Sequence, residues 1–207
     1  MNINIIALLV SFGLLIIAMT IHEYAHGWVA YKLGDTTAKY SGRLTLNPMA
    51  HIDPFWTLLM PLFLFITTQG RFVFGAAKPV PINYWALRNP KKDILWIGAS
   101  GPLANFILAF LLSIPVRFIP LPAILNYILV QLIVINVVLG VFNLVPIPPL
   151  DGSRILMGLL PENLASRYAL IEPYAFIILI VLVWMGVLGI VVWPMVDFIL
   201  RLLGIPV

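Results

Sequence analysis

Two histidines and a glutamate lie within five residues of one another, in the run His22-Glu-Tyr-Ala-His26. His22 and His26 are four residues apart, so on an α-helix of about 3.6 residues per turn they share one face, as two ligands of one zinc ion do. Glu23 lies about 100° further round the helix, where its carboxylate could reach a water molecule on the metal. The spacing predicts a zinc site that activates water.

The same five-residue pattern also occurs by chance on helices of soluble proteins, where it is only a solvated polar face. Its surroundings argue against that alternative, because no charged residue occurs between Ile5 and Thr20. An ionisable side chain at membrane depth is disfavoured by about 2.5–3.5 kcal/mol on insertion scales. Three such groups need a compensating partner, and a hydrogen-bonded structural histidine would not explain the glutamate beside it.

The composition of the 207-residue chain is that of an integral membrane protein, with 62% hydrophobic and 10% charged residues. Soluble domains average about 45–50% apolar and about 25% charged residues. We expect one membrane-embedded domain over residues 1–207, with the first apolar stretch retained because it lacks the features of a signal peptide. The chain has no cysteine, so a metal must be held by nitrogen and oxygen atoms.

Five apolar stretches follow one another along the chain, at residues 5–30, 54–67, 94–116, 123–145 and 173–192. A crossing helix needs about 20 residues, so four stretches are long enough. The short one contains Pro61 and is expected to be re-entrant, although a crossing over residues 54–69 stays open. Residues 194–207 could form an interfacial helix or part of a further crossing.

Two segments between the helices, residues 40–48 and 71–81, are bounded by Gly, Asn and Pro and are predicted to be short extended pieces. They could form a small β-hairpin or sheet at the cytoplasmic face. The predicted fold is therefore an all-α polytopic membrane protein. It has five to six membrane helices, a re-entrant element and this small β-structure.

The positions of the basic residues predict an orientation. If the 94–116 helix is the one full crossing between the histidines and Asp151, residues 32–92 lie on one side. Ten of the twelve basic residues then share that side. They are Lys32, Lys39, Arg43, Arg71, Lys78, Arg88, Lys91, Lys92, Arg154 and Arg167. The positive-inside rule makes this side cytoplasmic, with these residues solvated.

We accordingly expect a multi-pass protein of the cell membrane, with an extracytoplasmic amino terminus and its active site toward the cytoplasm. Arg117 would lie on the opposite side, and Arg201 is not assigned. The net charge of +4 is then explained by topology, so no nucleic-acid partner is expected.

A catalytic zinc ion commonly has three protein ligands and an open position for water. The candidate third ligand is Asp151, in the run Asn143-Leu-Val-Pro-Ile-Pro-Pro-Leu-Asp-Gly152. Its prolines end a helix, and irregular backbone at membrane depth is tolerated only against protein or a wet cavity. An ordinary surface turn is the alternative. A polar and small stripe at Asn136, Gly140 and Asn143 leads to the break and favours the ligand.

The helix expected at residues 94–116 contributes one further polar candidate, Asn105. Gly98 and Gly101 fall near the same face and indicate close helix packing. The Asn105 amide needs a partner when buried; it could polarise a substrate carbonyl or form a hydrogen bond between helices, and both alternatives stay open. His51 has no partner at ligand spacing and is expected to be structural or interfacial.

In order and spacing, three motifs resemble the site-2 protease family of intramembrane zinc metalloproteases, and residues 40–54 and 74–81 resemble its compact prokaryotic branch. The three motifs are His22-Glu-Tyr-Ala-His26, Gly101-Pro-Leu-Ala-Asn105 and the run from Asn143 to Gly152. The resemblance implies His22, His26 and Asp151 as ligands of one zinc ion per chain. It also implies Glu23 as the general base and Asn105 as an active-site polar residue.

The predicted activity is hydrolysis of peptide bonds within or near membrane-spanning segments of other proteins, with the bilayer and such a substrate as partners. One alternative is an ion or proton transporter or channel that uses the same buried side chains, although the chain lacks the repeated halves of many transporters. Another is a zinc-binding scaffold that cleaves nothing. Neither the substrate nor the oligomeric state follows from the sequence.

Overall fold

The computed structural model describes residues 5–67 and 75–205. Its long helices are α1 (Ile5–Leu33), α4 (Pro90–Phe118) and α5 (Ala123–Asn143). Its shorter α-helices are α2 (Thr37–Tyr40), α3 (Met60–Thr67), α6 (Asp151–Leu159), α7 (Glu162–Ala169), α8 (Ala175–Trp184) and α9 (Val187–Leu202). Three 3-10 turns and one π-helical segment complete the elements: η1 (Pro48–His51), η2 (Pro54–Leu59), η3 (Tyr84–Ala86) and η4 (Glu172–Tyr174).

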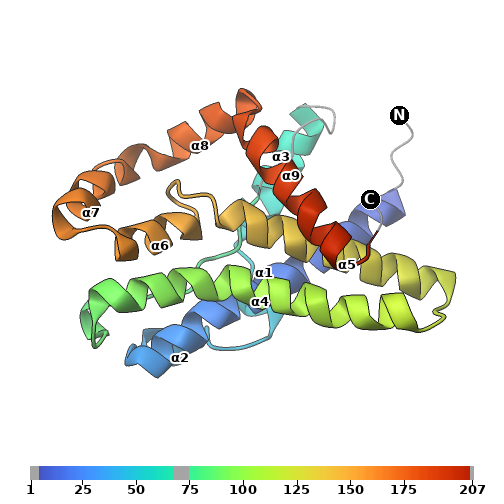
Figure 1. Ribbon diagram of the computed structural model, residues 1–207, viewed down its shortest axis with the longest axis horizontal. Coiled ribbons are helices and arrows are strands. Elements are labelled where there is room, and N and C mark those ends of the chain that lie inside the picture. Colours follow the sequence, from blue (N-terminus) through green and yellow to red (C-terminus); the bar gives the residue numbers. More distant parts are fainter. Residues whose placement is uncertain (1–4, 68–74, 206–207) are drawn as a thin grey trace.

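The three long helices form the centre of the molecule, because α4 packs against both α1 and α5. In Figure 1, α4 and α5 run side by side and α1 crosses them at an angle. Apolar side chains of α4, α5 and α9 form the larger core, in which Ile133, Val137 and Val141 are at most 1% exposed. The apolar sequence thus supplies both the buried faces and the outer surface.

A sharp break separates α5 from α6. Pro146 lacks a backbone N–H and cannot extend a helix, so α5 ends at Asn143 and the chain turns before α6 begins at Asp151. The turn is tight, since a Cβ atom on Gly152 would lie 2.2 Å from the carbonyl oxygen of Leu144. Only glycine allows this approach, which places Asp151 beside the long helices.

The carboxyl-terminal part folds back over the centre. In Figure 1, α6 and α7 form a hairpin at one end of the molecule, and α8 leads back to α9. Gly186 adopts a left-handed conformation with φ of 73° between these last two helices. The apolar stretch expected at 173–192 is therefore two helices rather than one, because the chain reverses at this glycine.

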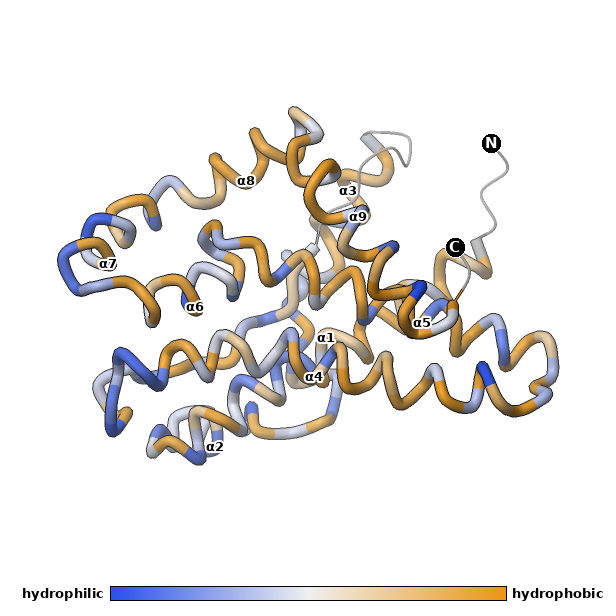
Figure 2. The backbone as a smooth tube through the Cα atoms, in the orientation of Figure 1, coloured by the Kyte–Doolittle hydropathy of each residue, from blue (hydrophilic) through white to orange (hydrophobic). Residues whose placement is uncertain are grey.

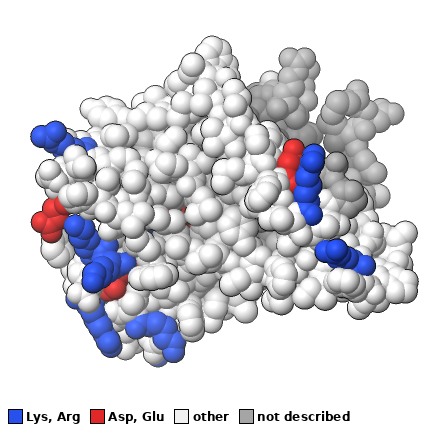
Figure 3. Space-filling model, viewed as in Figure 1, with Lys and Arg blue, Asp and Glu red and all other residues white. Residues whose placement is uncertain are grey.

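The outer surface is suited to lipid. Large apolar side chains are exposed along the long helices and α3, including Phe63 at 62% and Phe110 at 56%. Figure 2 shows the apolar residues along the helices and polar ones concentrated at bends and at one end. In Figure 3, charged side chains gather toward two ends of the face shown, with a broad band between them that carries few. Such a band fits a bilayer.

Among the described residues, four helical stretches are long and apolar enough to cross a membrane: Ile6–Leu33, Pro90–Phe118, Ala123–Asn143 and Glu162–Trp184. These four candidates among the described residues are fewer than the five to six membrane helices expected. The segment Pro54–Thr67 is a shorter apolar helix, as its length and Pro61 indicate. The carboxyl-terminal residues that the structure describes belong to α9 and the turn after it, and α9 packs on α5.

The expected β-hairpin or sheet is also wrong for the described residues, none of which forms a strand. Residues 71–74 of the second predicted segment lie outside the described part of the chain. Residues 76–83 have no regular structure, and side chains together with the Trp56 and His51 carbonyls, rather than a neighbouring strand, bind their backbone. Arg43 donates to the Lys78 and Pro79 carbonyls, and Asp35 accepts the Asn83 N–H. These contacts satisfy part of the backbone of the segment without a paired strand.

Candidate metal centre

Three buried side chains converge between α1, α4 and α6: His22, His26 and Asp151 are 5%, 3% and 5% exposed. The Nε2 atoms of the two histidines are 3.0 Å apart. Oδ2 of Asp151 lies 2.9 Å from Nε2 of His22 and 3.1 Å from Nε2 of His26. Ligand atoms around a tetrahedral zinc ion stand roughly 3.4 Å apart, so a small outward shift would admit the ion.

The second nitrogen of each imidazole fixes which atom carries the proton. Nδ1 of His26 lies 2.7 Å from the Ile97 carbonyl oxygen, which can only accept a hydrogen bond. Nδ1 of His22 lies 2.6 Å from the Asn105 side-chain oxygen, which also accepts. Both Nδ1 atoms therefore donate, and a neutral imidazole has only one N–H. Both Nε2 atoms then present lone pairs toward the Asp151 carboxylate.

Three acceptor atoms thus face one another at about 3 Å with no proton between them in these tautomers. Such an arrangement is repulsive unless a cation sits among the atoms, and neutral imidazole nitrogens with a carboxylate oxygen are a common donor set for zinc. Each imidazole also hydrogen-bonds through Nδ1 to an acceptor outside the cluster, which is the contact that orients metal-binding histidines in proteins. The residues present therefore fit a zinc ion.

Asn105 is completely buried, and both ends of its amide are used. Its nitrogen donates to the Ala18 carbonyl at 3.2 Å and to the Asn136 side-chain oxygen at 2.8 Å, which leaves its oxygen for His22. Asn136, also fully buried, donates in turn to the Leu132 carbonyl. This chain of hydrogen bonds links α5 and α4 to α1 and fixes the orientation of the His22 ring.

Gly101 of α4 lies directly over the two imidazoles. A Cβ atom at this position would stand 2.5 Å from Nε2 of His26 and 2.6 Å from Nε2 of His22. The absence of a side chain lets α4 approach the candidate ligand atoms themselves. The sequence indicated Gly101 only as a packing residue, since spacing along one helix cannot reveal what faces it.

The other oxygen of the Asp151 carboxylate points toward Arg154. Nη1 of Arg154 lies 3.5 Å from Oδ1 of Asp151, one turn further along α6. The carboxylate therefore faces the imidazoles with Oδ2 and a cation with Oδ1. This arrangement leaves one oxygen for a metal ion.

Glu23 is not part of the three-residue cluster. Its carboxylate oxygen Oε2 accepts a hydrogen bond of 2.8 Å from the Val80 backbone N–H, in the segment 76–83. Val80 is 6% exposed and packs close to Gly27, one helical turn beyond Glu23. The glutamate is thus held beside the cluster rather than inside it, and no sequence pattern indicates that a backbone amide holds it.

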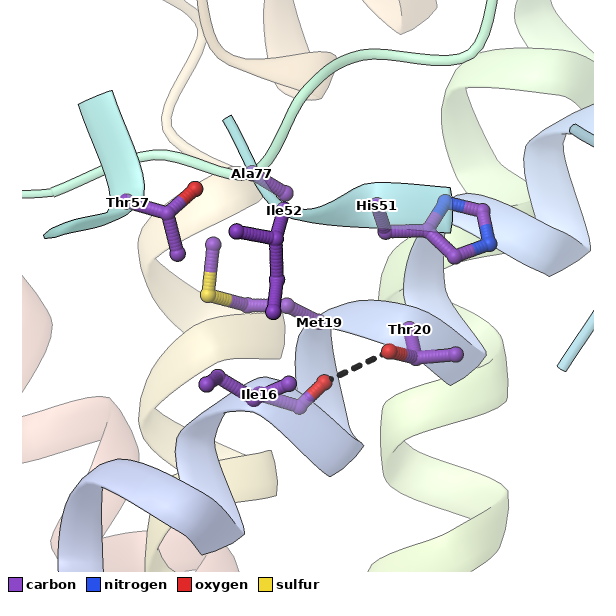
Figure 4. A pocket seen from close by; sticks show the side chains of 7 residues that line it. All are labelled: Ile16, Met19, Thr20, His51, Ile52, Thr57 and Ala77. Carbon is purple, nitrogen blue, oxygen red and sulfur yellow. Dashed lines mark hydrogen bonds between the residues drawn. The ribbon is translucent and has the colours of Figure 1, made fainter. Parts of the chain in front are cut away.

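His51 lies outside the cluster. It is 2% exposed, and its Nε2 lies 2.9 Å from the Thr45 carbonyl. Together with Thr20 and Ala77 it borders a cavity of about 10 Å³ between α1 and the loop that carries η1 (Figure 4). The expectation that His51 has a structural place agrees with this burial.

Comparisons with known proteins point to one family. The model for peptidase family M50 matches residues 119–186. The chain is 40% identical over 192 residues to the "Putative zinc metalloprotease YwhC" of Bacillus subtilis, covering 88% of this chain and 84% of that protein. It belongs to peptidase family M50. The resemblance to site-2 proteases is therefore confirmed, and with it the expected enzyme class, a metalloprotease.

Other M50 relatives are longer than the matched region. The "Putative zinc metalloprotease Rip2" of Mycobacterium tuberculosis is 31% identical over 169 residues, covering 81% of this chain and 63% of that protein. The "Zinc metalloprotease MJ0392" of Methanocaldococcus jannaschii is 30% identical over 154 residues, covering 74% of this chain and 35% of that protein. No solved structure matches the chain. Nothing in these findings supports the transporter alternative.

Replacing Gly101 with alanine should disrupt the cluster, because the new methyl group would overlap both imidazole nitrogens. Zinc added to metal-stripped protein should raise the Tm of the wild type in detergent, and Gly101→Ala should lose most of that rise. Gly13→Ala is the matched control, since no atom lies within 4 Å of its Cβ position. An equal zinc-induced rise in Gly101→Ala and the wild type would contradict the geometry.

Replacing Asn105 with alanine should leave the His22 ring without its acceptor. Loss of such an outer partner typically weakens metal binding or activity about 10- to 100-fold, and we expect a fall in zinc affinity of that size, measured by competition with a chelator. The exposed Asn163 of α7 serves as the control in Asn163→Ala. Unchanged zinc affinity in Asn105→Ala would show that this hydrogen bond does not orient His22.

Proposed function

We propose that this M50 peptidase hydrolyses peptide bonds within or near membrane-spanning segments of other proteins. One zinc ion would be held by His22, His26 and Asp151. The observation that carries the proposal is the convergence of two imidazole nitrogens and a carboxylate oxygen within 3.1 Å, inside a bundle of apolar helices. Zinc agrees with the names of the M50 relatives and with the donor set.

Zinc bound at such a site lowers the pKa of water toward about 7 and polarises a substrate carbonyl. The protein supplies the remaining functions. Glu23 takes the proton of the attacking water as general base and returns it to the leaving amide nitrogen. Its hydrogen bond from the Val80 amide keeps the carboxylate beside the cluster.

The histidines and Asp151 determine the charge of the centre. Two neutral imidazoles leave the charge of the cation unchanged, and the single carboxylate offsets one of its two positive charges. The net positive charge favours water ionisation at neutral pH. Asn105 acts in this proposal as a positioning residue, since its amide is fully used by His22, Ala18 and Asn136.

The proposed substrate is a membrane-spanning segment, because the cluster lies among helices whose outer surfaces are apolar. A helical substrate hides its peptide bonds in its own hydrogen bonds and must unwind locally before cleavage. Small or helix-breaking residues near the cleavage point would make unwinding easier. Peptides with an interrupted span are therefore the appropriate probes.

The proposed orientation has the amino terminus outside the cell membrane and the metal centre toward the cytoplasm. Exposed basic residues near the carboxyl end of α1, the start of α4 and the α6–α7 hairpin support it, including Lys32, Lys91 and Arg167. Figure 3 shows most of the charged side chains of the face in view at this end. Positive charge in short loops favours the cytoplasmic side.

Glu23→Gln should separate metal binding from catalysis. We expect wild type and variant, purified in detergent, to bind the same amount of zinc per chain. Cleavage of a synthetic membrane-spanning peptide with central Gly and Asn residues should fall about 10²- to 10⁴-fold, the usual contribution of a general base. Mass spectrometry of the products measures cleavage. Equal cleavage by both proteins would exclude Glu23 as the base.

The orientation can be tested by cysteine labelling, because the natural chain has no cysteine. Ile119→Cys lies in the loop after α4, and Lys91→Cys lies near the start of the same helix; both side chains are exposed. A membrane-impermeant maleimide added to intact cells should label Ile119→Cys and should label Lys91→Cys only after lysis. The reverse pattern would invert the proposed topology.

A further inference from the structure

The structure assigns a role to Arg43 that its sequence position did not indicate. We propose that Arg43 is a positioning residue for Glu23, because its guanidinium holds the segment whose Val80 amide binds the glutamate. The inference rests on the proposed function of Glu23 as general base. The basic residues as a group were expected to be solvated at the cytoplasmic face, whereas Arg43 is only 9% exposed.

The guanidinium of Arg43 binds backbone rather than a carboxylate. Its Nη2 donates to the carbonyl oxygens of Lys78 at 3.0 Å and Pro79 at 3.2 Å. Among the described residues, no ion pair includes Arg43. A charged group taken out of water needs strong hydrogen bonds in return, so these two contacts fix the cation and the backbone together.

The two carbonyls that Arg43 holds immediately precede the amide that binds Glu23. Val80 stands between Pro79 and Pro81, so it has the only N–H of those three residues. Proline also restricts the residue before it to extended conformations, which limits the directions that the Val80 amide can take. Arg43 holds the two carbonyls, and the Val80 N–H donates to Oε2 of Glu23 with an N–O distance of 2.8 Å.

Further contacts fix the register of the segment on α1. The Val80 side chain packs against Gly27, since a Cβ atom on Gly27 would stand 3.1 Å from Cγ1 of Val80. Gly27 follows Glu23 by one helical turn. At the far end, the fully buried Asp35 accepts the Asn83 N–H at 2.7 Å. Lys78 N donates to the His51 carbonyl at 2.9 Å. Among the hydrogen bonds that hold the segment, those of Arg43 are closest in sequence to the Val80 amide, so its loss should affect the Glu23 contact most.

The proposal can be measured without any substrate, by hydrogen exchange of the Val80 amide. Electron-transfer fragmentation of a longer peptic fragment can resolve this amide, because the neighbouring residues Pro79 and Pro81 have no exchangeable amide hydrogen. We expect exchange at least about tenfold faster in Arg43→Gln, which loses the cation, and in Glu23→Ala, which loses the acceptor. Arg167→Gln removes an equal charge from an exposed site of α7 and should exchange as the wild type does.

The kinetic consequence concerns kcat rather than substrate binding. A general base displaced by about 1 Å can lose up to about 100-fold in rate, so we expect kcat of Arg43→Gln to fall at least tenfold. KM for the synthetic membrane-spanning peptide should change less than about threefold, and zinc per chain should stay constant. Arg43→Lys should recover part of kcat, because the ammonium keeps the charge and enough donors for both carbonyls but lacks the fixed planar geometry of the guanidinium.

A second variant guards against simple misfolding. Val80→Pro removes the donor itself while keeping an extended backbone and should reproduce the loss in kcat with Arg43 intact. Unchanged exchange at Val80 in Arg43→Gln would overturn the proposal, as would faster exchange with wild-type kcat. If the wild type cleaves no membrane-spanning peptide, the proposed function fails, and the exchange comparison still decides whether Arg43 holds this amide on Glu23.

Discussion

The metal centre depends on one electrostatic condition, the close approach of two imidazole nitrogens and a carboxylate oxygen that are all acceptors when both imidazoles are neutral. Two Nε2 atoms and one carboxylate oxygen lie within 3.1 Å of one another in a buried place. In water such groups would be solvated separately, but among apolar helices their repulsion is only weakly screened. A divalent cation turns that repulsion into binding, and the surrounding contacts keep the three atoms in place.

Those contacts show how a membrane bundle is held in register without a hydrophobic driving force between its helices. In lipid, helices associate through close packing of small residues and through hydrogen bonds between side chains. Gly101 supplies the first kind of contact, since it brings α4 against the imidazoles. Asn105 and Asn136 supply the second, since their amides link α4 to α1 and to α5. The same residues that assemble the bundle therefore also orient the candidate ligands.

The segment 76–83 shows a different solution to the pairing of backbone groups. A β-strand would satisfy its N–H and C=O groups with a neighbouring strand, and the pattern of Gly, Pro and extended residues suggested one. Here Pro79 and Pro81 lack donors, Arg43 binds two carbonyls, and Glu23 and Asp35 bind two amides. The arrangement connects the loop directly to the proposed chemistry.

The sequence by itself determined the local features of this protein. The spacing of His22 and His26 put both on one helical face, the apolar stretches gave the long helices, and the prolines before Asp151 gave the end of α5. These features depend on neighbours within a few residues along the chain, where helical period and backbone chemistry are sufficient. The motifs also indicated the M50 family correctly.

Only the tertiary structure decided which distant groups meet. It brought Asp151 to within 3.1 Å of both histidines, joined Asn105 to His22, and buried Arg43 against the segment that binds Glu23. It also replaced the expected hairpin by side-chain contacts and divided the last apolar stretch at Gly186. The reason is physical: charge and propensity are properties of single residues, whereas burial and hydrogen-bond partners depend on what the rest of the fold places opposite them.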